Sequence, residues 1–150
     1  MKRTFIAKLF GTFLLIGTST CVQAQSNPAG PIPKEKFNLN KPVEEEIGYT
    51  HAVKTGSILY ISGTVATGDM QEQIKEIMEN IKRTLAKYNA SFQNVVKENV
   101  YTTDLDEFIK YKAIRSAYYS NDFPAATWVE VKRLYLPQYK VEIEVTARLL

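Results

Sequence analysis

The chain contains very little of the residue types that usually carry metal, redox or thiol chemistry. Its 150 residues include one cysteine and one histidine. Cys21 lies in a segment that we expect to be removed, so the remaining chain offers no disulfide, no thiol nucleophile and no cysteine metal ligand. His51 has no Cys, His or carboxylate at the spacing typical of a metal site. We therefore expect packing alone to stabilise the protein, with His51 in a structural or surface role.

No hydrophobic run is long enough to span a bilayer. Residues 9–20 form an apolar run of about a dozen residues, whereas a membrane-spanning helix needs roughly 20. Basic residues precede this run, and the small-residue segment 22–24 follows it. This arrangement is typical of a cleavable signal peptide over residues 1–24. We expect an exported protein, periplasmic or secreted, with no stable membrane insertion after cleavage; a lipoprotein acylated at Cys21 is the alternative.

A net charge is also missing from the part of the chain that remains after export. Three of the 19 lysines and arginines, and none of the 16 acidic residues, lie in residues 1–24. Residues 25–150 therefore hold 16 charges of each sign and have a formal net charge of zero. A neutral chain without a basic-aromatic stripe, a phosphate loop or a serine elbow gives no support for nucleic-acid binding, nucleotide binding or serine hydrolysis.

What the sequence does contain is one domain of strand and helix patterns. Residues 25–42 include four prolines and predict an extended or partly ordered arm. The domain then spans residues 43–150, which is enough chain for a self-sufficient core. Strands are predicted over residues 49–54 and 57–65.

The best-defined helix begins after Asp69. Asp69 as N-cap and Glu72 three residues later form a capping-box pattern. Apolar residues then recur at helical spacing, at Met70, Ile74, Ile77, Met78, Ile81, Leu85 and Tyr88. Asn89 is the predicted C-terminal stop.

The second half continues with a strand and a helix and ends in two strands. Residues 95–103 predict a third strand, followed by a helix that Asp104 or Asp106 caps and that ends before Pro124. Residues 123–147 predict two strands joined by a short turn. The predicted order is β-β-α-β-α-β-β, an α+β domain in which two helices can cover only one face of a mixed sheet.

The last strand carries carboxylates on one of its faces. Its side chains alternate between two sets, Val141, Ile143, Val145 and Ala147 on one face and Glu142, Glu144, Thr146 and Arg148 on the other. Because an unpaired carboxylate is costly to bury, the second set must meet solvent, a partner subunit or a ligand. Glu130 and Lys132 are predicted on the same mixed face, which suggests subunit association.

Several short motifs occur in the order and spacing of a known family. They are Tyr49-Thr50-His51-Ala52, Ile61-Ser62-Gly63, VYTTDL at residues 100–105, and FPAATWVEV at residues 123–131 followed by VEIEV at residues 141–145. Together they resemble the RidA/YjgF family, also called L-PSP endoribonuclease-like, across the whole domain. The resemblance implies a RidA/chorismate-mutase-like fold and a homotrimer whose three sheets enclose a central barrel, with ligand clefts between neighbouring subunits.

The resemblance also assigns site residues. Members with deaminase activity hydrolyse reactive enamines and imines made from amino acids and need no metal or organic cofactor. By position, Glu142 corresponds to the glutamate that positions or activates water, and Tyr49 to the tyrosine that closes the pocket. The substrate-binding positions fall on Gly63, Thr127, Trp128, Lys112 and Ala126.

Ala126 stands where the family has an arginine that pairs with the substrate carboxylate. A methyl group cannot make that two-pronged ion pair, and losing such an anchor costs on the order of 2–5 kcal/mol of binding free energy. The substrate is therefore expected to lack a carboxylate or to be held differently. Lys112 is either a replacement cation or an ordinary solvated lysine. Trp128 either fills the vacated volume, stacks on a ligand, or packs between subunits.

Two functions remain open from the sequence. The first is a cofactor-free hydrolase of a small imine, enamine or related compound, in which Glu142 is the general base and Tyr49 orders the substrate. The second is a small-ligand-binding or structural trimer without deaminase activity, in which Glu142 is an interface carboxylate and Tyr49 a packing residue. A ribonuclease function follows only from the older family label, and export together with a neutral chain argues against it.

Overall fold

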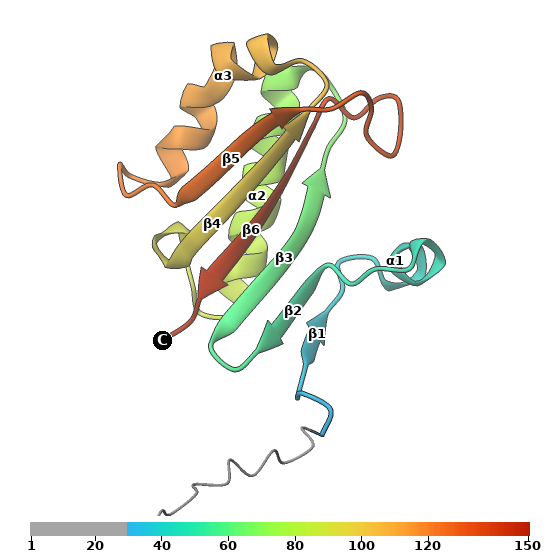
Figure 1. Ribbon diagram of the computed structural model, residues 1–150, viewed down its shortest axis with the longest axis vertical. Helices are drawn as coiled ribbons and strands as arrows, with labels where there is room; N and C mark the ends of the chain where they lie inside the picture. The colour runs from blue at the N-terminus through green and yellow to red at the C-terminus, as the bar shows by residue number, and fades with distance from the viewer. Residues whose placement is uncertain (1–29) are drawn as a thin grey trace, which may run out of the picture. The chain divides into compact units, whose positions relative to one another are not determined.

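The computed structural model describes residues 30–150, which form a six-stranded sheet and three α-helices (Figure 1). In chain order the elements are β1 (Glu35–Phe37), α1 (Lys41–Ile47), β2 (Ala52–Thr55), β3 (Ile58–Val65), α2 (Met70–Lys87), the 3-10 turn η1 (Phe92–Asn94), β4 (Val95–Thr102), α3 (Leu105–Tyr118), β5 (Ala125–Glu130) and β6 (Val141–Arg148). The predicted signal peptide and the first part of the predicted arm lie outside the described residues. Within residues 30–150, no helix has the length and apolar character that a bilayer crossing requires.

The strands lie in the order β1-β2-β3-β6-β4-β5, and only β4 and β5 run parallel to each other. The final strand β6 therefore occupies the middle of the sheet, between β3 and β4. The predicted short turn before it is wrong, because residues 131–140 form a long connection from the edge strand β5 to the sheet centre. Side-chain alternation along a strand reports which face is buried and carries no information on which strand lies beside it.

The structure confirms the predicted helix α2 and its signals. The Asp69 carboxylate accepts a hydrogen bond from the Glu72 N–H at 2.8 Å, and the Glu72 carboxylate accepts one from the Asp69 N–H at 3.0 Å. The predicted apolar residues from Met70 to Leu85 are fully buried and form the centre of the core. Asn89 has a φ of 54°, in the left-handed region, just after the helix end.

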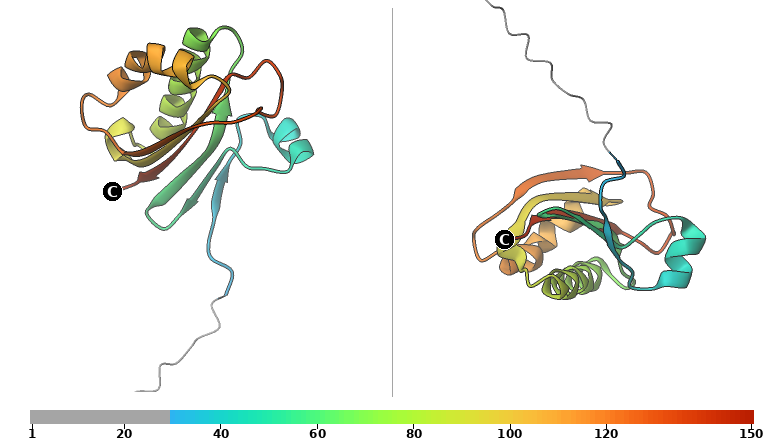
Figure 2. Two further views of the ribbon diagram at one scale, coloured as in Figure 1. Left: turned by 45° about the horizontal axis from the view of Figure 1, so that its top comes forward. Right: turned by 90° about the horizontal axis from the view of Figure 1, so that it is seen from below.

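The second predicted helix is α3, and Asp104 is its cap. The Asp104 carboxylate accepts a hydrogen bond from the Glu107 N–H at 2.8 Å. α3 connects the parallel strands β4 and β5 as a crossover. Figure 2 shows α2 and α3 on the same face of the sheet, so the other face, called the open face below, carries no helix from α2 or α3.

Two N-terminal elements were not predicted. β1 lies within the predicted arm and pairs antiparallel with β2, which extends the sheet at that edge. α1 begins inside the arm and continues past the predicted domain boundary at residue 43. The sequence did carry helix signals here, because Pro42 lies in the first turn and Gly48, with a φ of 92°, follows the last.

The two faces of β6 divide as predicted. Val141, Ile143, Val145 and Ala147 are buried, while Glu142 and Glu144 lie half-buried on the open face. Glu130, however, does not share that face. Its Oε2 accepts a hydrogen bond from the Leu105 N–H at 3.0 Å, at the start of α3, and Lys132 lies in the connection beyond β5.

Candidate functional site

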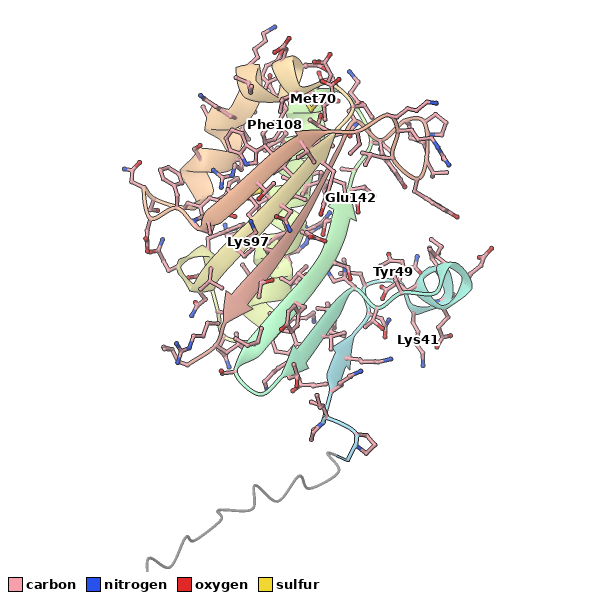
Figure 3. The ribbon with its side chains drawn as sticks, viewed as in Figure 1. Lys41, Tyr49, Met70, Lys97, Phe108 and Glu142 are labelled. Atoms are coloured by element: carbon pink, nitrogen blue, oxygen red, sulfur yellow. The ribbon has the colours of Figure 1, made fainter. Side chains whose placement is uncertain are left out.

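A cavity of about 480 Å³ opens between the centre of the sheet, α1 and the connection 131–140. Its volume lies in the range of small-molecule sites, roughly 300–1,000 Å³. The sheet contributes Ser62, Gly63, Val65 and Glu142 to its lining. The remaining lining residues are apolar or aromatic, namely Val43, Ile47, Tyr49, Tyr135, Leu136 and Tyr139. In Figure 3, Glu142 lies on the near, open face of the sheet, and Tyr49 lies beside α1.

Glu142 rests directly on Gly63. A Cβ atom at residue 63 would overlap the Glu142 Oε1 and lie 2.6 Å from its Cδ. Gly63 lies where the pairing of β3 with β6 is irregular, between Ile61 and Thr64, and the missing side chain leaves room for the carboxylate. Two strands and one glycine thus fix the position of this acid at the cavity.

Two carboxylates on β6 have different surroundings. Glu144 Oε1 accepts hydrogen bonds from Asn99 Nδ2 at 2.7 Å and from the Tyr101 hydroxyl at 3.2 Å. Within residues 30–150, no side-chain hydrogen bond involves the Glu142 carboxylate. Burial, and secondarily the negative charge of Glu144, raise the pKa of Glu142 above its ordinary value. A carboxylate with a raised pKa is a better proton acceptor near neutral pH.

Tyr49 is held at the cavity by a hydrogen-bonded clamp around Glu44, which the sequence reasoning missed. The Glu44 carboxylate is 1% exposed and accepts hydrogen bonds from the backbone N–H groups of Leu39 at 2.7 Å, Asn40 at 2.8 Å and His51 at 2.8 Å. The Glu44 backbone carbonyl accepts from the Tyr49 N–H at 3.0 Å. Burial opposes ionisation of Glu44, but these hydrogen bonds, together with one from the Asn38 side-chain amide, outweigh it and lower its pKa.

The clamp surrounds two residues that the sequence singled out. Burial, followed by the charges of Glu44, Tyr139 and Glu142, raises the pKa of Tyr49, so its phenol stays neutral and can donate a hydrogen bond. His51 is 3% exposed, and its Nε2 lies 2.8 Å from Thr84 Oγ1. Its place is structural, between β2 and α2.

The opposite wall of the cavity depends on Gln73 of α2, another residue that the sequence reasoning missed. Its Nε2 donates to the carbonyls of Gly68 and Gln138, each at 2.9 Å, and its Oε1 accepts from the Lys140 N–H at 2.9 Å. These bonds hold the connection 131–140 against α2. They fix the backbone that carries Tyr135, Leu136 and Tyr139. Because Gln138 and Lys140 lie more than 60 residues away from Gln73 in sequence, a local pattern could not reveal them.

The remaining predicted site residues lie elsewhere in the chain. Ala126, Thr127 and Trp128 belong to the edge strand β5, which β4 separates from β6. Thr127 Oγ1 accepts a hydrogen bond from Lys97 Nζ at 2.8 Å. Lys112 is exposed on α3. One chain therefore brings together Tyr49, Gly63 and Glu142, and keeps the other four predicted residues away from them.

Trp128 packs within its own chain, against a buried ion pair that was not predicted. Its ring meets Phe108 edge-on at a centroid distance of 5.2 Å. Its Nε1 lies 3.4 Å from Oε1 of Glu98, which pairs with Arg115 Nε at 2.8 Å. Ala126 lies opposite Glu98 in the β4–β5 register. The residue opposite Ala126 is thus a buried carboxylate that already pairs with the Arg115 guanidinium.

No group of three His, Cys, Asp or Glu side chains within residues 30–150 has the arrangement of a metal site. The described cavity itself contains one carboxylate and three phenols among its ionisable groups. Such a set can accept a proton from water, donate hydrogen bonds and provide aromatic surface.

Comparison with known proteins identifies what this arrangement is similar to. The model of the family described as Endoribonuclease L-PSP matches residues 40–149, most of the chain. A RutC family protein of Pyrococcus abyssi is 37% identical over 95 residues, which cover 57% of this chain and 75% of that protein. A second RutC family protein, from Pyrococcus horikoshii, is 32% identical over 106 residues, or 65% of this chain and 82% of the relative.

Solved structures give the same answer for the fold. A member of the YjgF/YER057c/UK114 family from Mycobacterium tuberculosis superimposes with a TM-score of 0.73 at 25% identity, covering 78% of this chain and all of that one. RidA from a Psychrobacter species has a TM-score of 0.64 at 32% identity, covering 68% of this chain and 89% of that one. The region that the family model matches, residues 40–149, includes all the residues that line the cavity.

Proposed function

Because the chain belongs to the RidA/YjgF, or Endoribonuclease L-PSP, family, we propose that its cavity binds a small molecule and hydrolyses a carbon–nitrogen double bond. One observation carries this proposal. The Glu142 carboxylate lies half-buried in the cavity, unpaired within the described chain and with a raised pKa. A structural carboxylate would be expected to have hydrogen-bond partners, as Glu144 does.

The proposed reaction uses the residues that meet at the cavity. Glu142 accepts a proton from water as the water oxygen bonds to the imine carbon, and the C=N π electrons move to nitrogen. The protonated Glu142 returns that proton to nitrogen, which gives a neutral carbinolamine. Glu142 then takes the hydroxyl proton of the carbinolamine and passes it to nitrogen, so that the C=O bond forms as the C–N bond breaks. The products are a carbonyl compound and an amine, and Glu142 is again a carboxylate. Tyr49, as a neutral phenol, orders the substrate by hydrogen bonding.

The proposal includes a homotrimer with the cavity at a subunit boundary. Large apolar side chains near the cavity are exposed in the single chain, among them Ile47 at 45%, Tyr49 at 41% and Tyr135 at 65%. Exposed apolar surface of this kind is typical of a contact region. Light scattering on the purified protein is expected to give the mass of three chains. A monomer at micromolar concentration would exclude a shared site.

The proposal also includes export, with residues 1–24 as the signal peptide. Intact mass measurement of the protein secreted by its host is expected to give a chain that begins at Gln25. A mass that includes residues 1–24 would contradict export by cleavage, and an added lipid at Cys21 would assign the lipoprotein alternative.

Hydrolysis is tested by generating imines in place. An amino-acid oxidase supplies imines that carry a carboxylate, and an amine oxidase supplies imines that lack one. The protein should accelerate the loss of imine, and Glu142→Gln should lower the rate by about 100-fold. Glu46→Gln, at an exposed acid of α1 outside the cavity lining, is the matched control and should leave the rate unchanged. Equal rates with protein and with buffer alone would exclude this function.

The second candidate is ligand binding without turnover, and Ala126 favours it. Within the described chain, no cation lines the cavity to hold a substrate carboxylate. If Ala126→Arg created hydrolysis of carboxylate-bearing imines in a protein that otherwise has none, the natural chain would be a binding protein.

A further inference from the structure

The charged groups around the cavity are distributed unevenly. Its lining contains a single carboxylate, Glu142, and no lysine, arginine or histidine. The second β6 carboxylate, Glu144, lies close enough to raise the pKa of Glu142. The lining side chains therefore contribute negative charge and no positive charge to the cavity.

Most basic side chains on the neighbouring elements are already engaged by other groups. Lys41 lies 3.7 Å from Glu45, and Lys140 lies 3.3 Å from Glu107. Lys97 donates to Thr127. The connection 131–140 also carries Lys132 and Arg133, both exposed and both outside the lining.

Aromatic side chains line the cavity together with the acid. Tyr49, Tyr135 and Tyr139 contribute three rings, and Ile47 and Leu136 add aliphatic surface. Aromatic faces attract ammonium-type cations, most strongly where water is excluded. An anion placed here would lose its hydration and meet the like charge of Glu142. The side-chain donors of the lining are the phenols and the Ser62 hydroxyl, and that hydroxyl already donates to the Thr50 carbonyl.

From this arrangement we infer that the cavity selects ammonium or iminium cations that carry a compact apolar body, and rejects carboxylates. The cationic nitrogen pairs with Glu142, and the apolar body packs against the tyrosine wall. The inference uses the same site as the proposed hydrolysis and names its substrate class, a carboxylate-free amine or the imine derived from it. It does not depend on turnover.

The test compares three ligands of one shape: 2-phenylethylamine as the cation, 2-phenylethanol as the neutral analogue and phenylacetate as the anion. Calorimetry or ligand-observed NMR on the purified protein should show the amine binding about tenfold or more tightly than the alcohol, because a charge-assisted hydrogen bond to a partly buried carboxylate is strong. Phenylacetate should bind more weakly than the alcohol.

Two substitutions separate charge recognition from general binding. Glu142→Gln should reduce the preference for the amine over the alcohol to about twofold or less, because the amide keeps the shape and removes the charge. Glu46→Gln should leave the preference intact. Tyr135→Leu, at the exposed rim, should weaken the amine several-fold more than the alcohol, because it removes an aromatic face and keeps apolar bulk; it provides the test if Glu142→Gln does not fold.

Several results would overturn the inference. They are no binding of any of the three ligands, tighter binding of phenylacetate than of the alcohol, or an unchanged amine preference in Glu142→Gln. If a Lys132→Gln, Arg133→Gln double substitution abolished phenylacetate binding, these two basic side chains would be the ligand anchors and the inference would be wrong.

The binding experiment can succeed where the hydrolysis assay fails, and the reverse. Glu142-dependent binding of amines without acceleration of imine loss would support the inference and exclude the proposed reaction. Hydrolysis that depends on Glu142 but is fastest for carboxylate-bearing imines would support the reaction and exclude the inference.

Discussion

Glu142 and Glu144 lie two positions apart on the same face of β6, yet only Glu144 is held by hydrogen bonds from neighbouring side chains. Burial without compensating donors makes ionisation of Glu142 costly, and the adjacent charge adds to that cost. Ionised Glu142 therefore lowers the stability of the fold, while its raised pKa makes it a better proton acceptor. Such a trade-off is typical of functional positions.

The cost predicts that Glu142→Gln stabilises the protein at neutral pH. With a folded-state pKa raised above the unfolded value near 4.5, the stability contributed by protonated Glu142 is fully present below that value and lost as pH rises through the folded pKa. The amide does not ionise, so thermal denaturation should give a higher midpoint for Glu142→Gln at pH 8, with the advantage shrinking at pH 4.

His51 titrates in both proteins and cancels in this comparison. Burial lowers its pKa, so each protein loses stability as pH falls through and below the ordinary value near 6.5, where the unfolded chain binds the proton. A natural chain that is more stable than Glu142→Gln at pH 8 would show that the Glu142 carboxylate has stabilising partners in the assembled protein.

Gly63→Ala is expected to displace Glu142 while leaving the fold intact. The added Cβ would overlap the carboxylate end of a flexible side chain, so Glu142 swings away at little cost in stability. Amine affinity or imine hydrolysis should fall about tenfold or more, while the thermal midpoint stays within a few degrees. In a Glu142→Ala background, the same glycine substitution should have almost no further effect on function, because the two residues act through one contact. Equal losses in both backgrounds would place the role of Gly63 elsewhere.

At the scale of elements, α1 and the segment after it form one unit organised by Glu44. Its carboxylate accepts hydrogen bonds from backbone N–H groups at both ends of the segment, those of Leu39, Asn40 and His51. Tyr49 lies within this closed segment, and the apolar residues Val43 and Ile47 of α1 face the same cavity. The position of this wall of the cavity therefore depends on the buried carboxylate of Glu44.

Glu44→Gln is predicted to loosen this unit. An amide keeps one accepting oxygen but turns an NH₂ group toward donors, so a buried hydrogen bond is lost at about 1–3 kcal/mol of unfolding free energy. Denaturant unfolding measures that loss, and ligand affinity should fall in parallel because Tyr49 is no longer fixed.

The adjacent residue offers a matched control. Glu45 is exposed, and within residues 30–150 its one ion pair is with Lys41. Glu45→Gln should therefore change the unfolding free energy by at most about 0.5 kcal/mol. If both substitutions had the same effect, the clamp would have no special role.

These elements also show how far the sequence could predict the fold and the site. α2 was predictable because its cap, apolar spacing and stop at Asn89 all agree. The place of β6 in the sheet was not, since strand order depends on packing between distant segments. Glu44 and Gln73 were missed because a buried polar side chain is recognisable only from its partners. Tyr49, Gly63 and Glu142 were proposed by resemblance, and the structure places all three at one cavity.

At the scale of the whole molecule, the separation of the predicted site residues favours assembly. Glu142 lies at the centre of the sheet and Ala126 on its edge strand, with β4 between their strands. No rearrangement of one chain that keeps this sheet brings them together. In a closed ring of identical subunits, the edge strand of one chain can border the cavity of the next, because each copy offers both surfaces.

This arrangement predicts complementation between two inactive chains. Glu142→Gln removes the acid from its own cavity, and Ala126→Trp places a bulky ring where β5 would border the cavity of the neighbouring chain. Each variant alone should lose the tight binding of the amine. When the two are unfolded and reassembled together in equal amounts, random mixing in a ring gives about a quarter of the sites a natural acid and a natural edge strand. Calorimetry should therefore recover about a quarter of the natural number of binding sites at natural affinity. Binding that stays absent in the mixed assembly, while each variant still forms the natural oligomer, would place the whole site within one chain and leave β5 outside it.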